Sequence, residues 1–164
     1  MIIYLKNKHT LKVNDFEFKC CIGKNNISKN KIEGDNKTPK GTFELGHLYY
    51  REDRIKKPLT NLKIYKIKKN MGWCNDTTNK KNYNRLIKIN KRIDHEKLFR
   101  KDHKYDLLIL IKYNYKKRML GKGSCIFLHL TQNYKPTAGC VALNKNDFLI
   151  MLKLIDKKTR IKII

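Results

Sequence analysis

The sequence lacks any long hydrophobic run. Its apolar stretches, such as Leu107 to Ile111, are far shorter than the ~20 residues that a membrane-spanning helix requires. The N-terminal residues Met1 to Leu5 are too short for the apolar core of a signal peptide, and no basic segment precedes them. We therefore expect no transmembrane segment. Three alternatives remain for the location of the protein: the cytoplasm, a trimmed exported form, or export by a route that the sequence does not show.

Cysteine pairs with the spacing of a metal site are also absent. The five Cys are an odd number and none form a C-x-x-C pair, which argues against a disulfide framework and against a structural zinc site. Cys20, Cys21 and Cys125 lie in apolar, strand-like runs and are predicted to be small core residues. Cys140 differs because it lies in a glycine-containing turn, the setting that a reactive thiol needs.

Arginine is scarce beside lysine. The 39 basic residues comprise 32 Lys and 7 Arg, spread over the whole chain, and the net charge is +25. Nucleic-acid sites usually concentrate Arg and exposed aromatic side chains in one patch, so no specific nucleic-acid partner is predicted. The chain is also rich in Ile and Asn, which share A/T-rich codons with Lys. Two explanations of the charge stay open: gene composition, or a polyanionic partner such as a wall polymer or a membrane surface.

The chain has no glycine/serine linker, low-complexity block or internal repeat. Its 164 residues are enough for one domain that buries roughly two-thirds of the surface of the unfolded chain. We therefore predict a single domain over residues 1–164, present as a monomer.

Short strand-like segments dominate the chain. Asn14-Asp15 is a turn, followed by Phe16, Phe18, Cys20 and Ile22 at alternating positions, a pattern typical of a hairpin with one buried face. Two polar segments, 23–41 and 71–83, are expected to be loops. Further strands are predicted at 42–50, 62–68, 84–90, 106–113, 124–130 and 160–164.

Helical spacing is confined to two places. Phe148, Leu149, Leu152 and Ile155 predict a helix over about 145–156, with Asn144 or Asn146 as its N-cap. A second, shorter helix is expected over 94–100, capped by Asp94. The predicted fold is therefore mainly β, a sandwich or partly closed barrel with one or two short helices.

One histidine and one cysteine near the C-terminus suggest chemistry. His129 ends the segment Phe127-Leu128-His129, and Cys140 follows in Pro136-Thr137-Ala138-Gly139-Cys140-Val141. An imidazole that removes the proton of a thiol makes a nucleophile for acyl transfer. Gly139 leaves room beside the thiol for a substrate backbone. The alternative is a buried Cys and a hydrogen-bonded His on adjacent strands.

Three segments together resemble the L,D-transpeptidase (YkuD-type) catalytic domain, in a short, single-domain bacterial branch. The segment Gly34 to Phe43 resembles its G-D-x-x-T-P-x-G-x-F motif, and His129 with Thr137 to Val141 resembles its H…[S/T]-x-G-C signature. Intermediate matches are 72–76, 83–84, 95–102, 105–106 and 123–129. The chain departs from the usual signature at Ala138, where a second His is common, and at Ala142, where Arg is frequent. The interval between His129 and Cys140 is also shorter than in the common pattern.

The resemblance implies acyl transfer on peptidoglycan stem peptides, without metal or cofactor. Cys140 would attack the carbonyl of the diamino acid at the third position, and His129 would act as general base and acid. The carbonyl of Leu130 would orient His129, and backbone N–H groups around Gly139 would bind the oxyanion. The family also implies a location in the bacterial cell envelope or periplasm.

Several further residues are candidates for substrate binding, and four of them have a structural alternative. Thr137 either hydrogen-bonds in the active-site turn or caps it. Arg100 either binds a substrate carboxylate or pairs with Asp102 or Asp106. The remaining substrate-binding candidates are Trp73, which is otherwise core, Tyr105, which is otherwise a packing residue, Asn84 and Ser124.

Residues 35–43 form either a flap over the cleft or an ordinary turn. His9, His47, His95 and His103 show no paired ligand spacing and are interpreted as surface or structural residues.

Two other functions stay open beside the transpeptidase. An L,D-carboxypeptidase or amide hydrolase would use the same site with water as the acceptor. A non-enzymatic basic module that binds an anionic polymer would account for the charge alone.

Overall fold

The computed structural model describes residues 1–164, and most of its regular structure is β. It has fourteen strands and one helix: β1 Ile2–Leu5, β2 Thr10–Val13, β3 Phe16–Cys21, β4 Ile27–Ser28, β5 Thr38–Pro39, β6 Gly41–Tyr50, β7 Ile64–Lys66, β8 Met71–Cys74, β9 Leu86–Lys88, β10 His95–Lys97, β11 Leu107–Ile111, β12 Phe127–Leu130, β13 Val141–Leu143, α1 Lys145–Leu154 and β14 Arg160–Ile163. The predicted mainly-β class is confirmed.

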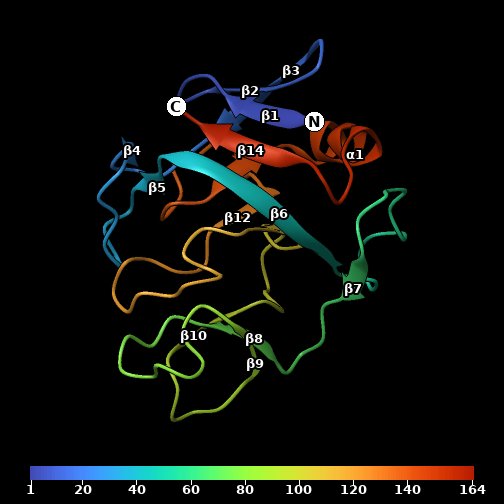
Figure 1. The fold of residues 1–164 in the computed structure, drawn as a ribbon. Helices are drawn as coiled ribbons and strands as arrows, with labels where there is room; N and C mark the ends of the chain where they lie inside the picture. Colours follow the sequence, from blue (N-terminus) through green and yellow to red (C-terminus); the bar gives the residue numbers. More distant parts are fainter.

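Eight strands close into a barrel. They follow the order β11-β12-β13-β3-β2-β1-β14-β6, and pairing of β6 with β11 completes the ring, while β7 adds to the outer side of β6. Two pairs within the ring are parallel, β1 with β14 and β12 with β13. In Figure 1 the first and last strands, β1 and β14, run side by side and parallel, so the N-terminus lies at one end of this pair and the C-terminus at the other.

The barrel core follows from alternation along the strands. In β1, Ile3 and Leu5 are fully buried while Ile2 and Tyr4 are partly exposed, as expected when successive side chains point to opposite faces. Strand β11 is different because all five of its residues are buried. Its odd-numbered residues belong to the barrel core, whereas Leu108 and Leu110 join a second cluster outside the barrel. This explains the uninterrupted apolar run.

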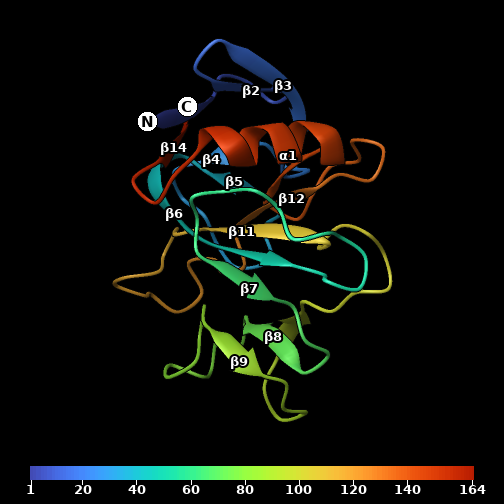
Figure 2. The ribbon, with the colours of Figure 1, turned by 90° about the vertical axis from the view of Figure 1, so that its right-hand side faces the viewer.

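A three-stranded sheet, in the order β10-β8-β9, contributes Trp73 and the partly buried Met71 to that second cluster. Figures 1 and 2 show it as a separate layer beyond β7 and β11, away from α1. Trp73 on β8 meets Phe127 on β12 edge to face, with ring centroids 5.3 Å apart. The sheet and the barrel wall therefore share one aromatic contact zone, which flanks β12.

The short helix predicted over 94–100 was wrong, and the loop predicted over 71–83 was partly wrong. His95–Lys97 is instead strand β10, paired antiparallel with Met71–Cys74. The physical reason is long-range: β8 has two free edges, and β9 and β10 satisfy the backbone groups on both of them. Just after β10, the N–H of Leu98 bonds the Met71 carbonyl at 3.1 Å, and the Leu98 side chain is fully buried in the second cluster.

Helix α1 covers one side of the barrel (Figure 2) and buries Phe148, Met151 and Leu152 in the core. Asn144 is the N-cap: its side-chain oxygen accepts the N–H of Asp147 at 2.9 Å. No helix in the structure combines the length and the apolar character needed to cross a membrane.

The N-cap gives a stability prediction. Replacing Asn144 by Ala removes the acceptor for the Asp147 N–H and should lower the free energy of unfolding by about 1 kcal/mol. The matched control is Asn146→Ala, two residues on and exposed, which should be neutral or slightly stabilising because Ala favours helix. Urea denaturation followed by circular dichroism measures both. Equal effects of the two substitutions would contradict the assignment of the cap.

Candidate active site

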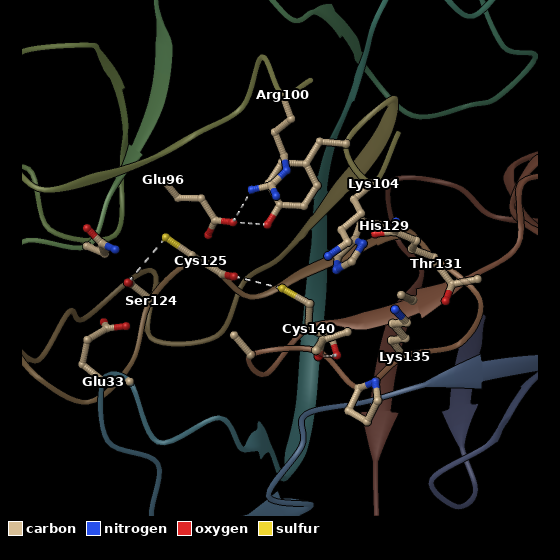
Figure 3. A pocket seen from close by; sticks show the side chains of 18 of the residues that line it. Glu33, Glu96, Arg100, Lys104, Ser124, Cys125, His129, Thr131, Lys135 and Cys140 are labelled. Atoms are coloured by element: carbon tan, nitrogen blue, oxygen red, sulfur yellow. Dashed lines mark hydrogen bonds and ion pairs between the residues drawn. The ribbon is translucent and has the colours of Figure 1, made fainter. Parts of the chain in front are cut away.

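His129 and Cys140 line one cavity of about 400 Å³, shown in Figure 3. His129 is on β12, two residues after Phe127 and therefore on the same outer face of the barrel. Cys140 immediately precedes β13, the parallel neighbour of β12. Because β12 and β13 are parallel neighbours, His129 and Cys140 lie on the same wall although eleven positions separate them in the sequence. Both are buried, with at most 6% of either residue exposed.

Two contacts hold the imidazole of His129. Its Nδ1 lies 2.8 Å from the carbonyl oxygen of Leu130, so Nδ1 carries the proton and donates, because a carbonyl can only accept. The ring of Tyr105 contacts the imidazole edge to face, at 5.2 Å between centroids. Nε2 is left as the basic nitrogen, free of any hydrogen bond within the protein.

The thiol of Cys140 is also held by backbone. It donates to the carbonyl of Cys125 at 3.2 Å and accepts the N–H of Phe127 at 3.4 Å. Cys125 has a positive φ of 54°, and its own N–H bonds Asn84 Oδ1 at 3.2 Å. The bend at Cys125 therefore turns its carbonyl toward the thiol.

The turn before Cys140 is closed by Thr137. Its hydroxyl donates to the Cys140 carbonyl at 2.6 Å and accepts the N–H of Gly139 at 3.1 Å. Of the three amides in this turn, only the N–H groups of Ala138 and Cys140 have no acceptor. The Thr137 side chain shapes the turn and also lines the cavity.

Gly139 is required by a close approach within the protein itself. Its φ is +139°, and a methyl group on it would lie 2.7 Å from the Lys37 carbonyl oxygen. Gly23 meets the same segment, because a methyl group there would lie 2.4 Å from the Asn36 carbonyl. The space that the sequence suggested for a substrate backbone is therefore filled by residues 36–37. The motif segment Gly34 to Phe43 and the turn that precedes Cys140 therefore pack directly on each other.

Hydrogen bonds secure this packing. Thr38 Oγ1 accepts the N–H of Gly23 at 2.9 Å, and the Thr137 N–H bonds the Ile22 carbonyl at 2.9 Å. Asp35 holds the preceding loop through the N–H of Lys37 and through Lys31, whose ammonium is 2.7 Å away. Residues 35–43 thus support the turn before Cys140 and do not line the cavity, whereas Lys31, Glu33 and Gly34, just before them in the chain, do.

Burial keeps the resting pair uncharged. Burial is the main cause that raises the pKa of the Cys140 thiol to about 12, with the charge of Glu96 adding to it. Burial likewise lowers the pKa of His129 to about 4, and the charges of Lys104 and Arg100 act in the same direction. At neutral pH the pair is therefore a thiol and a neutral imidazole.

An acidic and basic network lies beside the pair. The hydroxyl of Tyr105 donates to Glu96, and Arg100 lies 3.7 Å from the same carboxylate. Burial, the largest effect, raises the pKa of Glu96, against the opposing influence of Tyr105 and Arg100. Arg100 also makes two hydrogen bonds to Asp102, at 2.9 and 2.7 Å. The pairing alternative for Arg100 is thus the one that the structure shows.

Not every candidate residue reaches the cavity. Tyr105, Ser124, Arg100 and Thr137 line it. Trp73 and Asn84 are each 1% exposed and lie behind the wall, joined by a 2.9 Å hydrogen bond from Trp73 Nε1 to Asn84 Oδ1. Because the same oxygen bonds the N–H of Cys125, this pair supports the bend that faces the thiol.

Several lining residues were missed by the sequence reasoning. Glu96 and Asn75 fall in segments that carried the family resemblance, so the motif itself could have pointed to them. Lysines carried no such signal, because one lysine among 32 does not stand out. The missed residues that line the cavity with polar side chains are Lys31, Glu33, Asn75, Glu96, Lys104, Thr131, Gln132 and Lys135. No group of three or more His, Cys, Asp or Glu side chains is arranged to hold a metal ion.

A barrel with a histidine on one strand and a cysteine just before the adjacent parallel strand, both in one cavity, defines a class of candidate thiol acyltransferases. Comparison with protein families makes the assignment specific. The family model of the L,D-transpeptidase catalytic domain, YkuD, matches residues 1–163. The chain therefore belongs to this family. Neither the curated proteins nor the solved structures give a significant match.

The packing at Gly139 gives a second stability prediction. Gly139→Ala should lower the free energy of unfolding by about 2 kcal/mol or more, since it adds backbone strain and a clash with the Lys37 carbonyl. Gly121→Ala is the control, because Gly121 also has a positive φ of +72° but open space beside it, and should cost about 1 kcal/mol. Urea denaturation compares the two, and an equal or smaller loss for Gly139→Ala would refute the close approach.

The uncharged resting pair predicts the pH dependence of alkylation. Below a raised pKa, the thiolate fraction grows about tenfold per pH unit, so reaction of Cys140 with iodoacetamide should rise steadily between about pH 6 and about pH 9. A thiolate–imidazolium pair would instead react at a nearly constant rate over that range. Peptide mass spectrometry of the labelled Cys140 peptide measures the rate, with Cys140→Ala as background. A plateau would contradict the neutral pair.

Proposed function

We propose that this protein is a cysteine-dependent L,D-transpeptidase in which Cys140 is the nucleophile and His129 the general base and acid. The observation that carries the proposal is the shared cavity, with His129 Nδ1 engaged by the Leu130 carbonyl and Nε2 left free. Family membership supports the reaction class and peptidoglycan as the substrate class.

The first step is acylation. The Cys140 sulfur attacks the carbonyl of the diamino acid at the third position of a donor stem, and His129 Nε2 takes the thiol proton. Because both groups are neutral at rest, with pKa values of about 12 and about 4, proton transfer accompanies the attack rather than preceding it. The C–N bond to the terminal D-amino acid then breaks, and its amine leaves with the proton from His129.

The developing oxyanion needs hydrogen-bond donors near the sulfur. The N–H groups of Cys140 and Ala138 have no acceptor within the protein, whereas that of Gly139 is bonded to Thr137. We therefore assign the first two as donors and the Gly139–Thr137 bond as the brace of the turn. Each preorganised donor is worth about 3 kcal/mol of transition-state stabilisation.

The second step resolves the thioester. An amine of a second stem gives up its proton to His129 Nε2 and attacks the acyl carbon, and the thiol leaves and regains the proton. With water in place of the amine, the product is a trimmed stem and the enzyme acts as an L,D-carboxypeptidase. The acceptor is the difference between the two outcomes, and the residues that bind the donor are common to both.

The assignment predicts which variant escapes acylation. Incubation with a carbapenem, whose ring carbonyl forms a stable thioester with enzymes of this family, should add the mass of the drug to the wild type and leave Cys140→Ala unmodified. Cys74→Ala is the matched control, because Cys74 is buried but does not line the cavity, and it should react like the wild type. His129→Gln should react about 10²–10⁴-fold more slowly. Intact-protein mass spectrometry measures all four.

Acylation that persists in Cys140→Ala would refute the nucleophile. Products from purified muropeptides then separate the two reactions: cross-linked dimers establish transpeptidation, whereas trimmed stems without dimers establish the carboxypeptidase.

A further inference from the structure

The cavity around Cys140 has ends of opposite charge. In Figure 3, Glu33 and Glu96 lie on one side of the Cys140 sulfur, and Lys104 and Lys135 lie on the other, beside His129. The attacking sulfur is thus between an acidic and a basic end.

The two lysines at the basic end are unpaired. Neither the Lys104 nor the Lys135 ammonium has a hydrogen bond or an ion pair within the protein. Lys104 is half-buried, and its backbone is fixed because its carbonyl accepts the N–H of Leu130 at 2.9 Å. A half-buried cation held next to the reacting groups without a counter-charge is suited to bind an anion of the ligand.

The other cations of the cavity are already neutralised. Arg100 is bonded to Asp102 and lies near Glu96. Lys31, only 3% exposed, is paired with Asp35 at 2.7 Å. A substrate carboxylate would therefore have to displace a bonded partner from either of these two, but not from Lys104.

The acidic end offers acceptors. Asn75 lines the cavity at this end, because it lies two residues after Trp73, the strand partner of Glu96, and its buried Oδ1 has no hydrogen-bond partner. Glu33 accepts only the hydroxyl of Tyr83, at 2.5 Å, through one of its two oxygens. A buried acceptor without a donor is costly, so an N–H or ammonium group of a ligand would be favoured at this end.

We propose that these two ends set the direction of the donor stem, with its terminal carboxylate at Lys104 and the side-chain amine of its diamino acid at Glu33 and Asn75. This inference rests on the proposed function. In the donor, the terminal carboxylate is one residue beyond the attacked carbonyl, about 4 Å along the chain, and the amine extends from the opposite side of that carbonyl. The charges of the substrate thus match those of the cavity in order and sign.

Binding to the inactive Cys140→Ala protein tests the direction. The ligands are a donor stem with lysine at the third position, its C-terminal carboxamide, and its Nε-acetyl derivative, with Kd measured by calorimetry. Adding Lys104→Met should weaken the free stem about tenfold to hundredfold and leave the carboxamide unchanged. Adding Glu33→Gln should weaken the free stem and leave the acetylated stem unchanged. Lys101→Met, an exposed neighbour outside the cavity, is the control and should alter none of them.

Each result decides between clear alternatives. Equal binding of the free stem with and without Lys104→Met overturns the inference, and so does a loss that persists with the carboxamide, because a different carboxylate would then be bound. Failure of every stem to bind overturns it as well. The proposed function is judged separately by carbapenem acylation of Cys140, so that a failed orientation and a failed catalytic assignment give different patterns.

Discussion

The contact on which the site depends is the close approach of two backbone segments, residues 36–37 against Gly139 and Gly23. Side chains at either glycine would meet a carbonyl oxygen at 2.4–2.7 Å. Because both glycines lack one, the loop that carries Lys31 and Glu33 packs against the turn that carries Cys140. Lys31 and Glu33 in the wall of the cavity therefore come from the first quarter of the chain, and Cys140 comes from the last quarter.

Burial explains why the imidazole and the thiol are both uncharged at neutral pH. Burial of the two side chains in the cavity wall raises the pKa of the Cys140 thiol and lowers the pKa of the His129 imidazole. A neutral pair has little reactivity toward water or oxidants. Polar backbone groups compensate for the enclosure: the carbonyls of Cys125 and Leu130 each accept one proton of the pair.

Much of the fold could be predicted from short patterns, and the failures share one cause. The helix at Lys145–Leu154 has its own cap and apolar spacing, so local signals were sufficient. His95–Lys97 was mistaken for a helix because its strand conformation depends on β8, a partner more than twenty residues away. The ring closure of β6 with β11 is likewise non-local and has no sequence signature. The roles of Arg100 and Trp73 could not be predicted for the same reason. Arg100 is paired with Asp102, and Trp73 is hydrogen-bonded to Asn84 behind the cavity wall.

By itself, the sequence determined the family, because His129, Cys140 and the motif at Gly34 to Phe43 carry the resemblance in their residue types and spacing. The tertiary structure alone decided which side chains surround them. Lysines such as Lys104 are indistinguishable in a chain with a net charge of +25, and only pairing in space separates the neutralised cations from the free ones. Electrostatic interactions depend on distance and burial, and neither of these can be read from the order of the residues.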